Sequence, residues 1–323
     1  MNIHSQCLAD NGNITYVRSL PEALPLWHNL TSDATILSYV IGVHIPFVHK
    51  PVQVKTPQNL IGRLEMPIAE REIEALLIKG VLEPSYYEED QFVSNFFLRP
   101  KKQPGKFRLI CNLKELNEFV EYKHFKMETV HSATNMMRRG CHMATIDLKD
   151  AYHSVPISVE HRKFRKIVWK GKLYRHTALP FGISCAPYIF TKLMKPILAR
   201  LRAAGHMSIC YLDDLYIQGD TYEQCESSVT ASYELLQGAG FHVNTEKSIL
   251  TLSCEAEFLG FHLNSKTMSI QLPSAKKQRI RGMCETLLNN GQDKTRQIAK
   301  VLGTMVATFP GVQFGPLHYR TLE

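Results

Sequence analysis

The 323-residue sequence lacks several features that would place it in a specialised class of protein. None of its eight cysteines forms a C-x-x-C pair, which argues against a zinc ribbon or a disulfide framework and favours reduced thiols. No apolar run approaches the roughly 20 residues of a membrane helix. The N-terminus has no basic segment followed by an apolar run. We therefore expect an intracellular protein, in the cytoplasm or the nucleus, with no membrane contact.

The composition is that of a folded, basic protein. Its hydrophobic content of 44% fits a globular chain long enough for one large domain or for two to three packed subdomains. The formal net charge of +8 favours a polyanionic partner such as nucleic acid. A solvated basic surface would give the same charge, so the charge alone does not decide between the two.

Short strand-like runs alternate with helix-like runs along the chain, which predicts an α+β fold. Prolines interrupt residues 1–52, so we expect an extension wrapped on the main body. Apolar residues at helical spacing predict a helix over 56–80 that ends at Gly80. The other expected elements are strands at 94–99, 107–113, 142–148 and 207–217, a basic hairpin over 164–174, helices at 185–201 and 222–238, short strands at 241–243, 249–251 and 258–263, and helices at 275–289 and 296–309.

Two adjacent carboxylates, Asp213 and Asp214, interrupt an apolar and strand-prone run. Such a pair is costly unless a cation lies against it. A turn at the Asp-Asp step would let both face Asp147, which ends a separate strand. Hard divalent cations suit this cluster, and two ions about 3.5–4 Å apart can activate an attacking hydroxyl and stabilise a leaving oxygen. An isolated Asp-Asp pair is more often an exposed turn, so the interpretation needs other motifs.

Three segments supply that support, because they resemble the successive palm motifs of reverse transcriptases in order and spacing. They are 145–152 (TIDLKDAY), 179–187 (LPFGISCAP) and 211–214 (YLDD). Residues 106–117 are similar to the fingers strand that contacts the incoming triphosphate, and 258–261 resemble the primer-grip hairpin. The segment 240–248 continues the likeness. The motif sequences are most similar to those of retrotransposon enzymes. Residues 303–323 most resemble DIRS-like elements, related to gypsy-type elements with long terminal repeats.

The resemblance implies an α+β right-hand polymerase with fingers, a palm and a partial helical thumb. The palm would be a ferredoxin-like antiparallel sheet with helices behind it. The implied division is an N-terminal extension at 1–52, fingers and palm at 53–270, and thumb or connection helices at 271–323. The implied activity is RNA-directed DNA polymerase, a nucleotidyltransferase that extends a primer from deoxynucleoside triphosphates as part of a retrotransposon. Its partners would be an RNA template, a DNA primer and their hybrid, and its cofactor two Mg²⁺ ions, with Mn²⁺ as a substitute.

The same resemblance implies roles for individual residues. Asp147 and Asp213 would be metal ligands, Asp214 would support the second ion, and the Ile146 carbonyl would complete a coordination sphere. The implied nucleotide-binding residues are Lys101, Arg108, Asp150, Ala151, Tyr152 and Lys247. The implied template and primer contacts are Phe181, Gly182, Phe258, Leu259, Gly260, Lys276 and Lys277.

Four of the implied roles fit the chemistry of their residues. Arg108 and Lys101 would neutralise triphosphate charge, although both could belong to a solvated hairpin. Tyr152 would lie under the incoming sugar and exclude a 2′-hydroxyl, unless it only packs behind the strand. Lys247 is the basic residue of its motif and the candidate for protonating the pyrophosphate leaving group.

Two other functions are compatible with the same motifs. A catalytically inactive relative could use the same fold to bind nucleic acid, although all three aspartates are present. An RNA-directed RNA polymerase shares the palm, but Tyr152 and the Tyr-Leu-Asp-Asp motif favour deoxynucleotides. Such elements commonly carry a ribonuclease H domain downstream, but none is expected within this chain, because no further set of acidic residues is available to build it.

Overall fold

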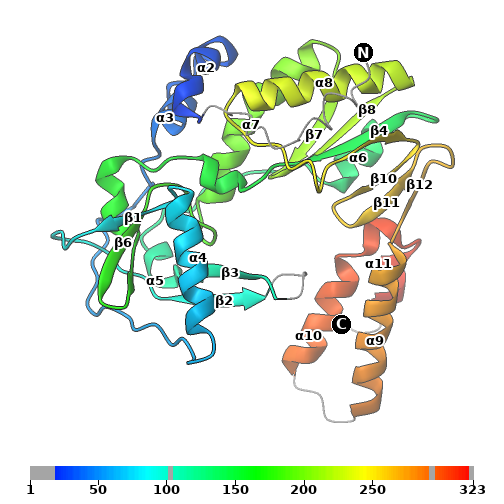
Figure 1. Cartoon of the computed structure of the whole chain (residues 1–323). Helices are drawn as coiled ribbons and strands as arrows, with labels where there is room; N and C mark the ends of the chain where they lie inside the picture. Colours follow the sequence, from blue (N-terminus) through cyan, green and yellow to red (C-terminus); the bar gives the residue numbers. More distant parts are fainter. Residues whose placement is uncertain (1–18, 101–104, 291–294, 320–323) are drawn as a thin grey trace.

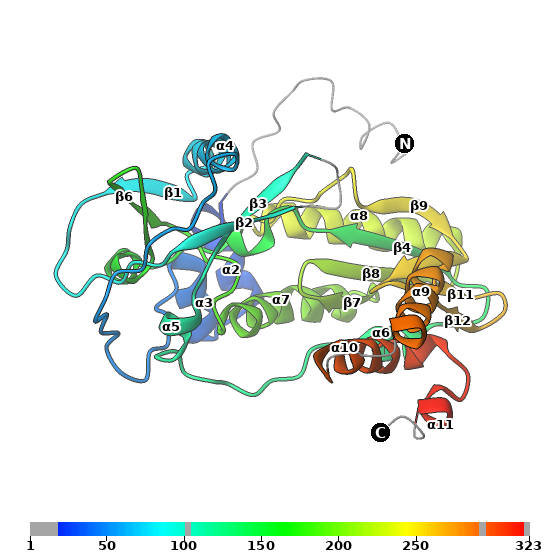
Figure 2. The ribbon, with the colours of Figure 1, turned by 90° about the horizontal axis from the view of Figure 1, so that it is seen from below.

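The computed structural model describes residues 19–100, 105–290 and 295–319. A four-stranded sheet forms the centre, and two further groups of elements lie below it on either side (Figure 1). Seen from below, the β2–β3 hairpin and helix α9 lie toward opposite ends of the central strands (Figure 2). No helix in the described ranges combines the length and the apolarity that crossing a bilayer requires.

The central sheet is the expected palm. Its strands run antiparallel in the order β7-β8-β4-β9, and α7 and α8 are the two crossovers, so the chain order is β-α-β-β-α-β. This is the ferredoxin-like arrangement that the resemblance implies. The palm elements are α6 (Val130–Met136), β4 (His142–Asp147), η2 (Ala151–Ser154), α7 (Ala186–Ala203), β7 (Met207–Tyr211), β8 (Asp214–Gly219), α8 (Tyr222–Gly238) and β9 (Ile249–Ser253).

Apolar side chains of one sheet face and of the two crossover helices form the main core. Leu193 and Ile197 of α7 and Leu215 of β8 are each fully buried in one cluster that continues into the fingers. The predicted strand at 241–243 is reduced to a single bridge between Val243 and Leu148. The core therefore fixes β4 and β8, the two strands that carry the candidate catalytic aspartates.

The fingers consist of two small antiparallel sheets, β2-β3 and β1-β6-β5, with a helix packed on them. The predicted helix over 56–80 is too long at its N-terminus, because it begins at Met66. Pro67 occupies the first turn, where a residue without an amide hydrogen is tolerated. The fingers elements are α4 (Met66–Ile78), β1 (Leu82–Ser85), β2 (Phe96–Pro100), β3 (Phe107–Cys111), α5 (Lys114–Asn117), η3 (Val159–Phe164), β5 (Lys166–Trp169) and β6 (Lys172–His176).

The C-terminal part holds a three-stranded sheet and the expected helices. The strand predicted over 258–263 is two strands, because Leu259 and Gly260 both have positive φ and turn the chain back. The helix predicted over 296–309 ends at Val306, shortly before Pro310. The elements are β10 (Glu255–Phe258), β11 (Phe261–Asn264), β12 (Ser269–Gln271), α9 (Ser274–Asn290), α10 (Thr295–Val306), η4 (Phe309–Gly311) and α11 (Gly315–Tyr319).

The described part of the N-terminal extension packs on the palm. It contains η1 (Pro21–Ala23), α2 (Leu24–Leu30) and α3 (Ala34–Ile41), and α2 and α3 contact α7. The Trp27 side chain is fully buried, and its indole N–H donates to the Ala239 carbonyl at 3.0 Å. Gly240 has φ +94°, and a Cβ there would lie 2.7 Å from the Leu20 amide nitrogen. The extension thus closes tightly on the C-terminal end of α8.

Candidate active site

The three predicted catalytic carboxylates meet at one end of the palm sheet. Asp147 ends β4 and pairs in register with Asp214, the first residue of β8. Asp213 lies in the turn just before Asp214, and its carbonyl accepts a hydrogen bond from the Leu148 amide at 2.8 Å. Strand pairing therefore brings together aspartates that are far apart in the sequence.

The β7–β8 turn is formed by Leu212 and Asp213, not at the Asp-Asp step as expected. Leu212 has φ +55°, a left-handed conformation that is unfavourable for a residue with a large side chain. The Cys210 thiol donates to the Leu212 carbonyl at 3.0 Å. Burial, and then the charge of Glu128, raise the pKa of Cys210, which keeps the thiol protonated as a donor.

A short segment after Val243 holds Asp147 in place. The Asn244 side-chain amide donates to Asp147 Oδ1 at 2.7 Å, and the Lys247 ammonium lies 3.5 Å from the same oxygen. The Asp147 amide donates to Ser248 Oγ at 3.0 Å. Lys247 thus lies beside the carboxylates. The contacts of Asn244 and Ser248 were not predicted, although both residues stand in the recognised segment 240–248.

The charges of the three aspartates act against one another. Burial, and then the negative charges of Asp213 and Asp147, raise the pKa of Asp214 to about 6. Burial also raises the pKa of Asp213, and the charge of Asp147 adds to this shift. A bound divalent cation offsets the repulsion between carboxylates that lie this close together.

The donor set fits an open magnesium site. In the described ranges, no group of three or more His, Cys, Asp or Glu side chains is arranged so that it could hold a metal ion without further ligands. Mg²⁺ usually keeps several waters and is held by one or two carboxylates together with substrate phosphates. Aspartates at the ends of adjacent strands fit that mode of binding. Ile146 pairs with Leu215 in the sheet, and the metal role of its carbonyl stays a prediction.

Aromatic rings connect the carboxylates with the fingers. The Tyr152 ring packs edge-on against two other rings, with 5.3 Å between its centre and that of Phe181 and 5.7 Å between its centre and that of Phe190. The Arg108 guanidinium lies 5.0 Å from the centre of the Phe181 ring, a cation–π contact. Phe181 thus contacts both the predicted sugar gate and the predicted triphosphate ligand. Lys101 lies outside the described residues.

Asp150 lies in the turn that follows β4, and Ala151 begins η2. Asp150 has φ +52°, and its carboxylate pairs at 2.6 Å with the ammonium of Lys79, the residue that follows α4. Ala151 is buried against the core. Arg108, Asp150, Phe181 and Lys79 line one cavity of about 100 Å³. The cavity therefore brings together two of the six predicted nucleotide-binding residues, Arg108 and Asp150, with the predicted template contact Phe181 and with Lys79, which was not predicted.

His153 faces the same cavity, and burial lowers its pKa to about 4. Its folded-state pKa lies below the unfolded value near 6.5, so the unfolded chain binds the proton more readily. The free energy of unfolding is then expected to fall as the pH drops from about 6.5 towards 4, by on the order of 3 kcal/mol for this residue. In His153→Phe this part of the acid dependence should disappear. Urea unfolding at pH 8 and pH 5 measures the difference, and equal acid slopes in both proteins would contradict the prediction.

Gly182, a predicted template contact, is held in a left-handed conformation by hydrogen bonds through Asn117. It has φ +99°, its carbonyl accepts from the Asn117 side-chain amide at 2.9 Å, and Ser184 donates to the same Asn117 side chain at 2.9 Å. The added Cβ of another residue would meet nothing closer than 3.7 Å. Glycine is therefore required here by conformation and not by a lack of space.

The predicted primer-contact residues lie on the β10–β11 hairpin and the start of α9. Phe258 is buried against Tyr216, so its ring packs the hairpin onto the palm, while Leu259 and Gly260 form a half-buried turn. The Lys276 ammonium lies 4.3 Å from the Phe261 ring and donates to the Gly260 carbonyl at 3.3 Å. Lys276 thus joins the hairpin to α9, whereas Lys277 is exposed.

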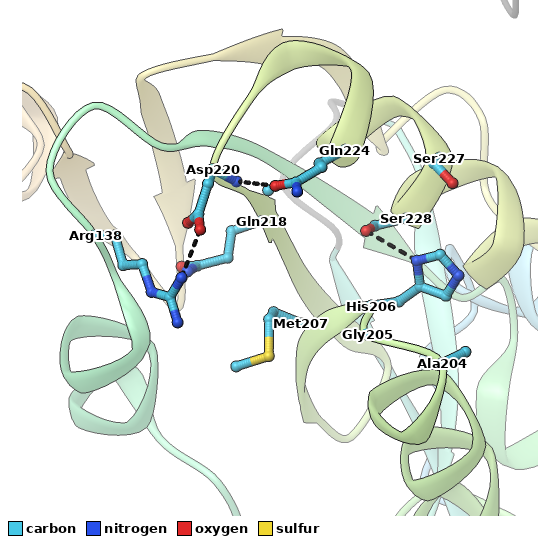
Figure 3. Close-up of a pocket in the computed structure, with 11 residues that line it drawn as sticks. Arg138, Ala204, Gly205, His206, Met207, Gln218, Asp220, Gln224, Ser227 and Ser228 are labelled. Carbon is cyan, nitrogen blue, oxygen red and sulfur yellow. Dashed lines mark hydrogen bonds and ion pairs between the residues drawn. The ribbon is translucent and has the colours of Figure 1, made fainter.

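A separate polar cavity of about 400 Å³ lies at the opposite end of the sheet (Figure 3). Its lining includes Arg138, His206 and Asp220, with an ion pair between Arg138 and Asp220. Asp220 follows β8, whereas Asp214 begins it. At roughly 3.3 Å per residue, the two lie about 20 Å apart. This cavity is therefore not part of the carboxylate site.

Comparison with known proteins agrees with this geometry. A family model of the reverse transcriptases (RNA-dependent DNA polymerases) matches residues 99–263. The Pro-Pol polyprotein of simian foamy virus type 1 is 27% identical over 196 residues, which are 60% of this chain and 16% of that polyprotein. The Pol polyprotein from the *Drosophila melanogaster* transposon opus is 25% identical over 218 residues, 65% of this chain and 21% of the polyprotein.

Solved structures confirm the expected α+β right-hand polymerase fold. The foamy viral protease-reverse transcriptase in complex with double-stranded DNA superposes with a TM-score of 0.68 at 20% identity, covering 92% of this chain and 53% of that one. The complex with an RNA/DNA hybrid gives a TM-score of 0.64 at 19% identity, covering 92% and 41%. With the family model matching more than half of its residues, the chain belongs to the reverse transcriptase (RNA-dependent DNA polymerase) family found in retroviral and retrotransposon Pol polyproteins.

Proposed function

We propose that this chain catalyses RNA-directed DNA synthesis, in which a DNA primer is extended on an RNA template from deoxynucleoside triphosphates. The observation that carries the proposal is the register of Asp147 opposite Asp214, with Asp213 in the adjoining turn. The raised pKa of Asp214 supports it, because ionised carboxylates in this arrangement favour bound cations. Family membership supports the same reaction.

Asp147, Asp213 and Asp214 would hold two Mg²⁺ ions, with Mn²⁺ as a substitute. When bound, the ions would activate the primer 3′-hydroxyl and stabilise the leaving oxygen. Arg108, placed on the Phe181 ring, would bind the triphosphate with its planar guanidinium. Lys247, whose side chain is 68% exposed beside Asp147, would donate a proton to the pyrophosphate that leaves.

The proposed partners are an RNA template, a DNA primer and the hybrid duplex. The foamy viral enzymes that share the fold were solved with double-stranded DNA and with an RNA/DNA hybrid. The net charge of +8 and the exposed Lys277 on α9 fit a partner whose phosphates are bound without sequence reading. An inactive nucleic-acid-binding relative is less well supported, because all three carboxylates are present and assembled.

We also infer a retrotransposon lineage near the DIRS-like and gypsy-related elements, and action inside the cell. The match to a *Drosophila* transposon polyprotein supports a mobile element. The proposed division remains an extension at 1–52, fingers and palm at 53–270 and thumb helices at 271–323. It is compatible with α9 beginning at Ser274, although β12 reaches Gln271.

Primer extension by the purified chain tests the proposed reaction. The assay contains an RNA template, a labelled DNA primer, deoxynucleotides and either Mg²⁺ or EDTA. We expect extension that requires the metal and that weakens with added salt. Salt-sensitive binding of the hybrid without any extension, in Mg²⁺ and in Mn²⁺, would favour the nucleic-acid-binding alternative.

Replacing Tyr152 by Ala is expected to increase ribonucleotide incorporation relative to deoxynucleotide incorporation by at least about tenfold. The ring is held by Phe181 and Phe190, and its loss would open space for a 2′-hydroxyl. Single-nucleotide incorporation with matched ribo- and deoxynucleotides measures the ratio. Tyr152→Phe keeps the ring and serves as the control. If the Ala variant discriminates as well as the Phe variant, Tyr152 is not the sugar gate.

A further inference from the structure

Strand β7 leads directly into the catalytic turn, and it is an edge strand of the palm sheet. An edge strand leaves a row of outward amide and carbonyl groups without strand partners. Backbone polar groups alternate in direction along a strand. In β7 the outward groups include the Ser208 carbonyl and the Cys210 amide. Both are hydrogen-bonded by side chains that lie outside the sheet.

An ion pair takes the place of a neighbouring strand at this edge. Arg202, at the end of α7, donates to the Ser208 carbonyl from Nε at 2.9 Å and from Nη2 at 2.7 Å. Glu128, which precedes α6, accepts from the Cys210 amide through Oε2 at 2.8 Å. Arg202 and Glu128 also pair with each other. One donor and one acceptor two residues apart are what an added strand would offer.

The contacts continue from this ion pair into the turn. The Cys210 thiol donates to the Leu212 carbonyl, Leu212 has the left-handed backbone, and Asp213 follows it. Glu128, Arg202, Cys210 and Leu212 line one cavity of about 160 Å³. Within the described ranges, β8 is the one strand that pairs with β7, so the outer edge of β7 has no strand partner there. Without the two side chains, water would compete for the outward groups of β7 next to a turn that leucine does not favour.

We propose that Glu128 and Arg202 are positioning residues for nucleotidyl transfer. By holding the free edge of β7, they keep Asp213 in place beside Asp147. They do not touch the reacting atoms. The proposal rests on the polymerase function proposed above and extends it to residues outside the recognised motifs.

Removing the Glu128 carboxylate is expected to lower the rate of nucleotide incorporation more than the affinity for substrates. Glu128→Ala should lower the maximal rate of single-nucleotide incorporation by about tenfold, because small displacements of a catalytic group are costly. The affinities for primer-template and for deoxynucleotide should stay within about twofold of wild type. Glu128→Gln keeps an acceptor oxygen and should recover most of the rate. Arg202→Met is an independent variant that should also slow the maximal rate.

The Arg138–Asp220 ion pair provides a matched control. It lies about 20 Å from Asp214, at the other end of β8, and it is drawn with a dashed line in Figure 3. Arg138→Met removes a surface guanidinium of the same kind from the palm. Its incorporation rate is expected to stay within about twofold of wild type.

Hydrogen exchange of the Cys210 amide tests the contact without any need for activity. Mass spectrometry of peptides covering 207–214 should show faster exchange in Glu128→Ala than in wild type and in Glu128→Gln, at unchanged melting temperature. Unchanged exchange would overturn the proposal even if wild type proved inactive. Faster exchange with an unchanged incorporation rate would overturn the positioning role and leave the polymerase function intact.

Discussion

Asp213→Asn is expected to reduce nucleotide incorporation by about 10³-fold or more, because loss of metal-based charge stabilisation is worth several kcal/mol in the transition state. The change keeps the size and shape of the side chain, and it removes a charge that already opposes those of Asp147 and Asp214. Binding of the primer-template should be retained. Single-turnover incorporation in Mg²⁺, with hybrid affinity measured in parallel, gives both quantities.

Asp220→Asn is the matched control for this substitution. Asp220 follows the same strand that Asp214 begins, and it pairs with Arg138 far from the site. Its loss should change incorporation by less than about twofold. Comparable loss of activity in both variants would mean that general damage to the palm, and not the missing metal ligand, explains the effect of Asp213→Asn.

Trp27→Ala is expected to destabilise the protein by about 3–5 kcal/mol, the usual cost of removing a large buried aromatic side chain. The Trp27 side chain is fully buried, meets Phe241 at 6.3 Å between ring centres, and bonds the Ala239 carbonyl. Removal leaves a cavity and an unpaired carbonyl at the end of α8. Chemical denaturation monitored by circular dichroism measures the loss.

Trp27→Phe separates the two contributions of this side chain. It keeps most of the apolar contact but loses the N–H donor, so a smaller destabilisation of about 1–2 kcal/mol is expected. Val54→Ala, at a fully exposed position, should change stability by less than about 0.5 kcal/mol. If Trp27→Ala behaved like Val54→Ala, the extension would not be part of the folded palm.

The carboxylate cluster could be predicted from the sequence because its motifs are contiguous. Asp147 and the Asp213–Asp214 pair stand in short segments whose order and spacing resemble one family, and strand pairing then brings them together. The palm helices were predictable for a related reason, since α8 has the expected bounds and α7 is displaced by only one or two residues. Local pattern and tertiary structure agree at these positions.

The hydrogen bonds and ion pairs that hold the site residues in place could not be predicted, because they join residues that no local sequence pattern connects. Asn244 reaches Asp147, Glu128 reaches Cys210, and Lys79 reaches Asp150, each across 71 or more positions. A side chain on one of these segments carries no sequence signal of its partner. The boundary errors have a different cause, since Pro67 delays the start of α4 and the positive φ of Leu259 divides one expected strand into two.

The strand order of the palm has a consequence for how the chain folds. Strand β4 lies between β8 and β9, yet both of these strands follow it by many residues in the chain. During synthesis at roughly 5–20 residues per second, β4 would wait for several seconds with both edges free. Non-local pairing of this kind slows folding, and the apolar β4 is prone to pair wrongly while it waits. The catalytic aspartates therefore cannot come together before β8 has been synthesised.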